Sequence, residues 1–160
     1  MMKLSHIDEH NHPRMVNVGE KKVAKRTAHA RAVVRLPVGA FNQIEKEALS
    51  TAKGSITQTA ILAGIMGSKK TNELIPLCHN ISLDSCDVEV TTNRDSEIVI
   101  ECRVEARHTT GVEMEALTAV SIAALTVYDM CKALSHEIEI KEIRLLEKTG
   151  GKSGYRHEIS

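Results

Sequence analysis

Hydrophobic and polar residues alternate along several stretches of the chain, and this alternation predicts β-strands. The clearest stretch is 98–107, where apolar residues face one way and the charged residues between them face the other. The same period marks residues 88–92 and 137–146, and residues 28–36 form a further predicted strand that ends at Pro37. A polar turn at 92–96 joins two of these strands into an antiparallel hairpin.

Three other stretches have helical periodicity. Residues 40–49 predict a short helix with Phe41, Ile44 and Leu49 on its apolar side. Ser55 can cap a second helix that runs to about Ser68. The strongest helix covers 111–134 and is apolar nearly all round, so we expect it to be buried on more than one side.

The resulting order, β-α-α-β-β-α-β, predicts an α+β fold of the ferredoxin-like, split βαβ type. We expect an antiparallel sheet with the helices on one face and an extra helix in the first crossover. The chain of 160 residues fits one domain, 1–160. Within it, 1–22 is expected to be an N-terminal arm and 148–160 a flexible C-terminal loop or tail.

Composition and charge exclude several classes of function. Lys plus Arg equals Asp plus Glu at 21 each, so no overall field attracts nucleic acid or an anionic membrane. Aromatic residues make up only 2%, too few for stacking on single-stranded nucleic acid. The four cysteines form no CxxC pair, and the first residues lack a secretory pattern. We therefore expect reduced cysteines, a cytoplasmic location, and neither membrane nor nucleic acid as a partner.

Asp129 and Lys132 are the first candidates for chemistry. They lie three residues apart on the long predicted helix, so their side chains are neighbours. An exposed ion pair is the ordinary interpretation of such spacing. On so apolar a helix, however, the two could form an acid/base pair in a dry pocket. There the lysine would keep the carboxylate ionised, and burial would make the ammonium easier to deprotonate.

Glu113 and Glu115 begin the same helix, where carboxylates complement the helix dipole. One carboxylate is enough to complement the dipole, so a second one on the other side of Met114 is less expected. At the helical rise per residue, Glu115 and Asp129 are about 21 Å apart along the axis. They cannot both touch one small reacting centre from the same chain. If both are functional, a second copy of the subunit must complete the site.

Cys78 and His79 follow an apolar run, but neighbours on an extended chain point to opposite faces, so mutual activation is not expected. His79 is either a hydrogen-bonding group for a ligand or a structural histidine. The histidines near the N-terminus, including His6, His10 and His12, have no carboxylate or cysteine to complete a ligand set, so we predict no metal site.

Several cations lie next to glycines or at predicted element ends: Arg26, Lys53, Lys69, Lys70, Lys148 and Lys152. Such charges are usually solvated. Lys53-Gly54 and the 150–154 loop nevertheless each place a cation beside backbone that can approach an anion. The loop is not a Walker motif, because the first glycine of that spacing is missing and no helix follows. Together these cations indicate binding of phosphate.

Motifs spread over nearly the whole chain resemble one known family. They are LIPLCH at 74–79, TGVEMEALTA at 110–119, LTVYDMCKA at 125–133 and KTGGKSG at 148–154. LSHI at 4–7 and MVNV at 15–18 also fit, although Asn17 stands where the family has Asp. This combination is similar to the cyclic pyranopterin monophosphate synthase family, the C protein of molybdenum cofactor biosynthesis.

The resemblance implies an enzyme, a phosphorus-oxygen lyase. It would convert cyclised dihydro-GTP into cyclic pyranopterin monophosphate and release diphosphate. The essential Asp and Lys of the family fall on Asp129 and Lys132, and Lys53 joins them as catalytic. The implied substrate-binding residues are Leu77, Cys78, His79, Glu113, Met114, Glu115, Arg26, Lys148 and Lys152. The family is a dimer-based hexamer with sites between subunits. It implies no required cofactor, and the sequence leaves open whether Mg²⁺ accompanies the triphosphate.

Two other classes of function remain as alternatives. The first is a non-catalytic, ferredoxin-like domain that binds a nucleotide or regulates a partner, since this fold has many functions. It would bind nucleotide reversibly and release no diphosphate. The second is a purely structural assembly subunit, which would have no affinity for nucleotides.

Overall fold

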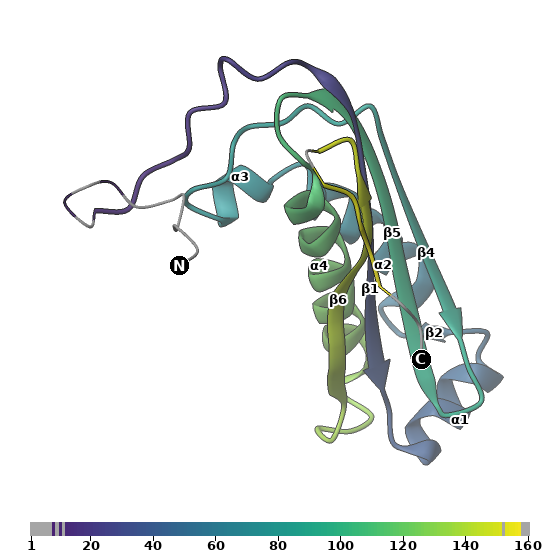
Figure 1. Ribbon diagram of the computed structural model, residues 1–160. Helices are drawn as coiled ribbons and strands as arrows, with labels where there is room; N and C mark the ends of the chain where they lie inside the picture. The colour runs from purple at the N-terminus through teal and green to yellow at the C-terminus, as the bar shows by residue number, and fades with distance from the viewer. Residues whose placement is uncertain (1–7, 9, 11, 152, 158–160) are drawn as a thin grey trace.

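The sheet and its helices have the predicted arrangement. The computed structural model describes residues 8, 10, 12–151 and 153–157. The strands are β1 (Ala24–Arg35), β4 (Ser85–Thr92), β5 (Glu97–His108), β6 (Glu139–Thr149) and β7 (Tyr155–Arg156). They form one antiparallel sheet in the order β4-β5-β1-β6-β7 (Figure 1). The split βαβ prediction is therefore confirmed, since β1 lies between β5 and β6.

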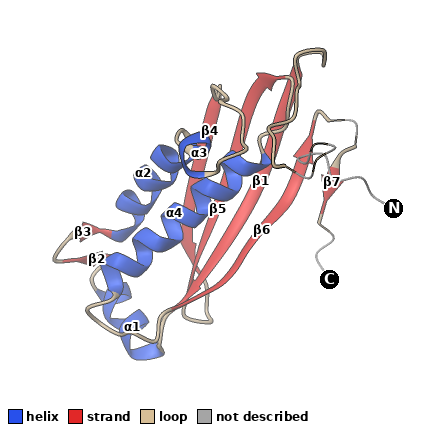
Figure 2. Cartoon of the chain, turned by 90° about the vertical axis from the view of Figure 1, so that its left-hand side faces the viewer, coloured by secondary structure: helices blue, strands red, loops and turns tan. Residues whose placement is uncertain are grey.

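The helices cover one face of this sheet (Figure 2). They are α1 (Val38–Lys46), α2 (Ile56–Ser68), α3 (Thr71–Leu74) and α4 (Glu113–Cys131). The short strands β2 (Ser50–Thr51) and β3 (Gly54–Ser55) form a separate hairpin between α1 and α2. The extra helix predicted in the first crossover is present, because α1 and α2 both lie between β1 and β4.

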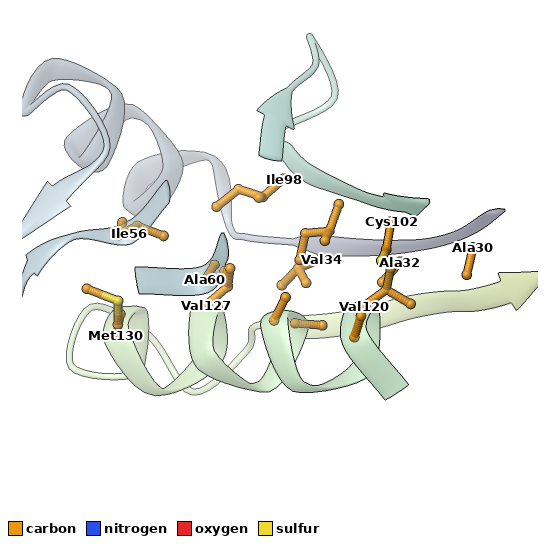
Figure 3. Packing of buried hydrophobic residues seen from close by; sticks show 14 of the residues in the cluster. Ala30, Ala32, Val34, Ile56, Ala60, Ile98, Cys102, Val120, Val127 and Met130 are labelled. Atoms are coloured by element: carbon orange, nitrogen blue, oxygen red, sulfur yellow. The ribbon is translucent and has the colours of Figure 1, made fainter. Parts of the chain in front are cut away.

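The core lies between the sheet and α4. Ala30, Ala32 and Val34 of β1 point toward Val120 and Val127 of α4, and all five are fully buried (Figure 3). Alanines at the centre of β1 let the helix approach the sheet closely. The helix α4 also packs against α2, which explains why it is apolar nearly all round.

Close packing of α2 on α4 depends on two glycines. A Cβ at Gly64 would lie 3.1 Å from the carbonyl oxygen of Ala119. A Cβ at Gly67 would lie 2.8 Å from Ile122 Cγ1, so something would have to shift. The helices therefore approach each other more closely than alanine would allow, which fixes the position of α4.

Some element boundaries differ from the sequence predictions. The first helix ends at Lys46, so Leu49 is not on it; Leu49 instead has a positive φ of 56° before the β2–β3 hairpin. The hydrophobic pattern does not predict this hairpin or α3, because both are too short to have a period. β6 extends through Thr149 and β7 follows, so Lys148 is a strand residue, not the start of a loop.

Candidate functional site

Three charged side chains meet at the C-terminal end of α4. Asp129 lies in the last turn, and Lys132 is the residue that caps the helix. Lys132 Nζ is 2.7 Å from Asp129 Oδ1, and Lys53 Nζ is 2.7 Å from Asp129 Oδ2. Lys53 also donates to the main-chain oxygen of Asp129 at 2.9 Å. Each carboxylate oxygen therefore has its own ammonium partner; we call these three residues the lysine–aspartate cluster.

The β2–β3 hairpin places Lys53 in this cluster. Lys53 lies in the turn of the hairpin, beside Gly54, whose φ of +106° favours glycine. The hairpin is anchored by the main-chain bonds from Leu49 to Ile44 and from Ile56 to Leu49. A segment 76 residues away in the sequence thus supplies the second cation of the cluster.

Charge dominates the properties of this cluster. The hydrogen bonds from Lys132 and then Lys53 lower the pKa of Asp129 to about 2. In turn, the hydrogen bond to Asp129 raises the pKa of Lys132. The three side chains are about half exposed in the single chain, at 50–54%. The sequence led us to expect a dry pocket that lowers the pKa of Lys132, and for the single chain this expectation is wrong. The expected ionised state of Asp129 agrees with its lowered pKa.

A cavity of about 640 Å³ lies at the opposite, N-terminal end of α4. Six of its lining residues are sequence-predicted site residues: Leu77, Cys78, His79, Glu113, Met114 and Glu115. The others are Val16, Val18, Lys21, Ile75, Ile81, Thr110 and Gly111. The loop before β4 and the first turn of α4 therefore come together around one space.

Glu115 is the most unusual group in this cavity. It is only 2% exposed, and its Oε2 atom has no hydrogen-bond partner among the described residues. Burial, helped by the negative charge of Glu113, raises its pKa to about 7. A buried carboxyl with a free oxygen can donate or accept a hydrogen bond near neutral pH. It is therefore suited to a polar ligand that enters the cavity.

Cys78 and His79 both line this cavity. His79 Nε2 lies 2.7 Å from the main-chain oxygen of Val16, which ties this wall to the segment before β1. Burial, with the charges of Glu115 and Glu113, raises the pKa of the Cys78 thiol. Cys78 is therefore a protonated thiol at neutral pH and not a nucleophilic thiolate.

Basic residues lie in a second, smaller hollow of about 260 Å³ next to this cavity. It is lined by Lys21, Arg26, Glu113 and Lys148, among others. Lys148 Nζ is 3.0 Å from Glu113 Oε1. Because Lys21 and Glu113 line both spaces, the basic hollow and the acidic cavity are continuous parts of one region.

Arg26 holds the backbone of this region together. It is 8% exposed, and its nitrogens donate to the main-chain oxygens of His108, Thr109 and Gly150. Gly150 has a φ of +86°, and a Cβ there would collide with the carbonyl oxygen of Lys25. Arg26 therefore ties the loop before α4 to the end of β6 as well as bordering the basic hollow.

The structure thus divides the sequence-predicted residues into two groups. Lys53, Asp129 and Lys132 lie at one end of α4, and the cavity and basic hollow lie at the other. Lys152 lies outside the described residues. Sequence reasoning missed Lys21, Val16 and Thr110. The family-like MVNV segment was the available signal for Val16, but the N-terminal arm was not expected to contribute to a site.

In the described part of the chain, no three His, Cys, Asp or Glu side chains come together as metal ligands. One helix, α4, is long and apolar enough to cross a membrane. More than half of it is buried inside the fold, and a core helix meets the same criteria, so this is weak evidence for a span.

The chain is similar to known proteins over nearly its whole length. Residues 15–151 match the MoaC family. The chain is 48% identical to a cyclic pyranopterin monophosphate synthase of Heliobacterium modesticaldum, over 97% of each protein. It is 47% identical to the protein of that name from Xanthomonas oryzae pv. oryzae, over 94% of this chain and 91% of the relative. It also matches 27% of the Drosophila melanogaster molybdenum cofactor biosynthesis protein 1, at 49% identity. The chain therefore belongs to the MoaC family.

Proposed function

We propose that this protein is a cyclic pyranopterin monophosphate synthase of molybdenum cofactor biosynthesis. The substrate would be 3',8-cyclo-7,8-dihydroguanosine triphosphate, and the products cyclic pyranopterin monophosphate and diphosphate. The names of relatives that align over nearly the whole chain support this activity. The observation that carries the proposal is the lysine–aspartate cluster, in which two ammonium groups share one ionised carboxylate.

The charges of this cluster suit the proposed chemistry. Lys132 is held as an ammonium by Asp129, so in the free protein it acts first as a proton donor. Asp129 orients both lysines and remains ionised at neutral pH. Ammonium groups at this position stabilise the negative charge that develops as diphosphate leaves. The names of the relatives favour this activity over the non-catalytic alternative.

The cavity at the other end of α4 would bind the rest of the substrate. Glu113, Met114 and Glu115, with Leu77, Cys78 and His79, would surround the purine-derived ring system. Arg26, Lys148 and Lys152, together with Lys21, would offset the triphosphate charge. Glu115 provides a polar group with an unused oxygen, and the carbon-rich walls of the cavity exclude water from the ring.

The active site would be shared between subunits of a dimer-based hexamer. The two groups of residues lie at opposite ends of α4, about 21 Å apart along its axis. One small substrate cannot react at one end while its ring is held at the other end of the same helix. The cluster of one subunit would therefore meet the cavity of its neighbour, and the half-exposed cluster would become enclosed.

Complementation between two inactive variants tests this sharing. Lys132→Ala removes the cluster, and Glu115→Gln alters the cavity. If sites are shared, refolded mixtures should regain roughly a quarter of wild-type activity, because half the pairs are mixed and each has one intact site. Mixtures as inactive as the single variants would contradict shared sites without contradicting the activity itself.

The protein would require no resident cofactor and would act in the cytoplasm. Any Mg²⁺ would arrive with the triphosphate, since phosphate oxygens are its usual ligands. Turnover that survives a chelator, with Mg²⁺ lowering only the KM, would agree with this role. Complete dependence on a metal retained by the purified protein would contradict it.

Direct assay of the reaction separates the functional classes. The protein would be supplied with the cyclised dihydro-GTP, and diphosphate and the fluorescent oxidised pterin would be measured. Lys132→Ala should remain a folded oligomer that makes no pterin, whereas Lys46→Ala, which removes an exposed lysine of α1, should be active. Reversible binding without diphosphate would favour the binding domain, and no affinity would favour the structural subunit. Near-normal turnover by Lys132→Ala would overturn the assignment of the cluster.

A further inference from the structure

Two cysteines lie on the neighbouring strands β4 and β5, and neither belongs to the lysine–aspartate cluster or lines the cavity of about 640 Å³. Cys86 is on β4 and pairs with Val104, whereas Cys102 is on β5 and pairs with Val88. This register puts the two cysteines diagonally on the same face of the sheet. Their sulfur atoms are 3.8 Å apart, and both are free thiols.

The two thiols differ in access to solvent. Cys102 is fully buried beneath the helices. Cys86 is only partly buried and lines a surface hollow of about 470 Å³ with Lys69 and Asn80. A small molecule that enters the hollow therefore reaches Cys86 first and finds Cys102 directly behind it.

The surroundings of Cys86 favour its thiolate. The Cys102 thiol and the Ser68 hydroxyl, which is 3.3 Å from Cys86 Sγ, are hydrogen-bonded to it. These bonds, helped by the charge of Lys69, lower the pKa of Cys86 to about 7. The same contact and burial raise the pKa of Cys102, and burial alone raises that of Cys131 to about 11. Cys86 is therefore the reactive thiol, because thiolates are the nucleophiles.

We propose that Cys86 and Cys102 form a peroxide-reactive pair that closes to a disulfide between β4 and β5. This site is separate from the proposed synthase activity. Its ligand is a small hydroperoxide, with hydrogen peroxide as the simplest member. Cys86 is the attacking sulfur and Cys102 the resolving one.

The disulfide forms in two steps. The Cys86 thiolate attacks one oxygen of hydrogen peroxide, the O–O bond breaks, and the departing hydroxide takes a proton to become water. Cys86 is then a sulfenic acid. The Cys102 sulfur attacks Cys86 Sγ, the S–O bond breaks, and the Cys102 proton leaves with the hydroxide as a second water. Two thiols are oxidised and one peroxide is reduced.

The fold can accommodate the bond. A disulfide needs its sulfurs at about 2.05 Å, so they must move closer by nearly half of the present 3.8 Å. β4 and β5 are already hydrogen-bonded to each other, so the two side chains must rotate toward one another, and β4 can adjust locally because it is an edge strand. The segment before β4 carries Cys78 and His79, which line the cavity. A crosslink would restrain β4, the strand that follows this segment.

Peptide mapping of the full chain tests the proposal. The protein would be treated with one equivalent of hydrogen peroxide, blocked with iodoacetamide and digested with trypsin. We expect peptide 71–94, which carries Cys86, to be joined to peptide 95–103, which carries Cys102. Fragmentation must assign the bond to Cys86 and not to Cys78, and dithiothreitol must reverse it. Absence of the linked pair, or a bond through Cys78, would overturn the proposal.

Variants separate the roles of the two sulfurs. Cys102→Ser, which keeps a hydrogen-bond donor beside Cys86, should stop the reaction at a Cys86 sulfenic acid that dimedone traps, and Cys86→Ser should abolish the crosslink. Cys131→Ser, which alters another buried cysteine, is the matched control and should crosslink like the wild type. Iodoacetamide at pH 7 should alkylate Cys86 at least about tenfold faster than Cys131. Equal rates in the wild-type protein would contradict the assignment of Cys86 as the nucleophile.

Discussion

The two ends of α4 carry carboxylates in opposite electrostatic situations. At the N-terminal end, Glu115 is 2% exposed and its pKa is raised to about 7 by burial. At the C-terminal end, Asp129 is about half exposed and its pKa is lowered to about 2 by two lysines. The same helix thus carries a carboxyl that is neutral in mildly acidic solution and one that is ionised throughout the physiological range.

This difference indicates how the work is divided between the ends. A buried, uncharged carboxyl suits recognition of a polar ring, because it can donate as well as accept a hydrogen bond. An ionised carboxylate between two ammonium groups suits proton transfer and stabilisation of departing phosphate charge. Under the proposed function neither end would suffice alone, so the site would be assembled from two subunits.

The largest effect is expected from removing the charge of Asp129. Asp129→Asn keeps the shape of the side chain but no longer holds Lys53 and Lys132 in place, so turnover should fall about 10³-fold. Pterin formation under saturating substrate measures the loss. Asp95→Asn, in the exposed β4–β5 turn, is the control and should retain wild-type turnover. A loss confined to KM would mean that the cluster only binds substrate.

At the N-terminal end of α4, Arg26→Ala should give the largest loss of stability. It leaves the main-chain oxygens of His108, Thr109 and Gly150 without their donor. We expect the free energy of unfolding to fall by about 2–3 kcal/mol in urea titrations. Arg94→Ala, which removes an exposed arginine, controls for loss of charge. Equal stability of the two variants would mean that Arg26 serves the ligand and not the backbone.

The pH dependence of stability tests the buried carboxyl directly. Because the pKa of Glu115 is higher in the folded state than in the unfolded chain, its ionisation destabilises the fold as pH rises from about 4.3 toward 7. Glu115→Gln removes this penalty, so relative to the wild type it should gain about 2 kcal/mol between pH 5 and pH 8. Denaturant unfolding at both pH values measures the gain. Glu45→Gln, on the exposed side of α1, is the control, and a Glu115→Gln gain no larger than the control's would contradict the burial argument.

The smallest effect is expected from disturbing the contact between α2 and α4. Gly67→Ala places a Cβ against Ile122 and should reduce the free energy of unfolding by about 1–2 kcal/mol. Gly39→Ala is a matched control, because nothing lies within 4 Å of its added Cβ. Thermal unfolding should separate the two variants. If they are equally stable, α2 does not constrain the position of α4.

Sequence periodicity was sufficient for the sheet and the long helix. The alternating residues from Ile98 to Ala106 are all buried on the predicted face. Short elements were missed because a two-residue strand has no period. The sequence therefore identified Lys53 as a cation beside a glycine but did not predict that it lies in a hairpin.

The sequence by itself determined the residue types, their order and the opposition of Glu115 and Asp129 along one helix, because helical rise follows from local geometry. Only the tertiary structure decided their charge states. Burial of Glu115, the approach of Lys53 to Asp129 and the engagement of Arg26 with three carbonyls all depend on segments distant in sequence. Electrostatic energies follow distance and solvent exposure in space, and neither quantity is contained in local periodicity.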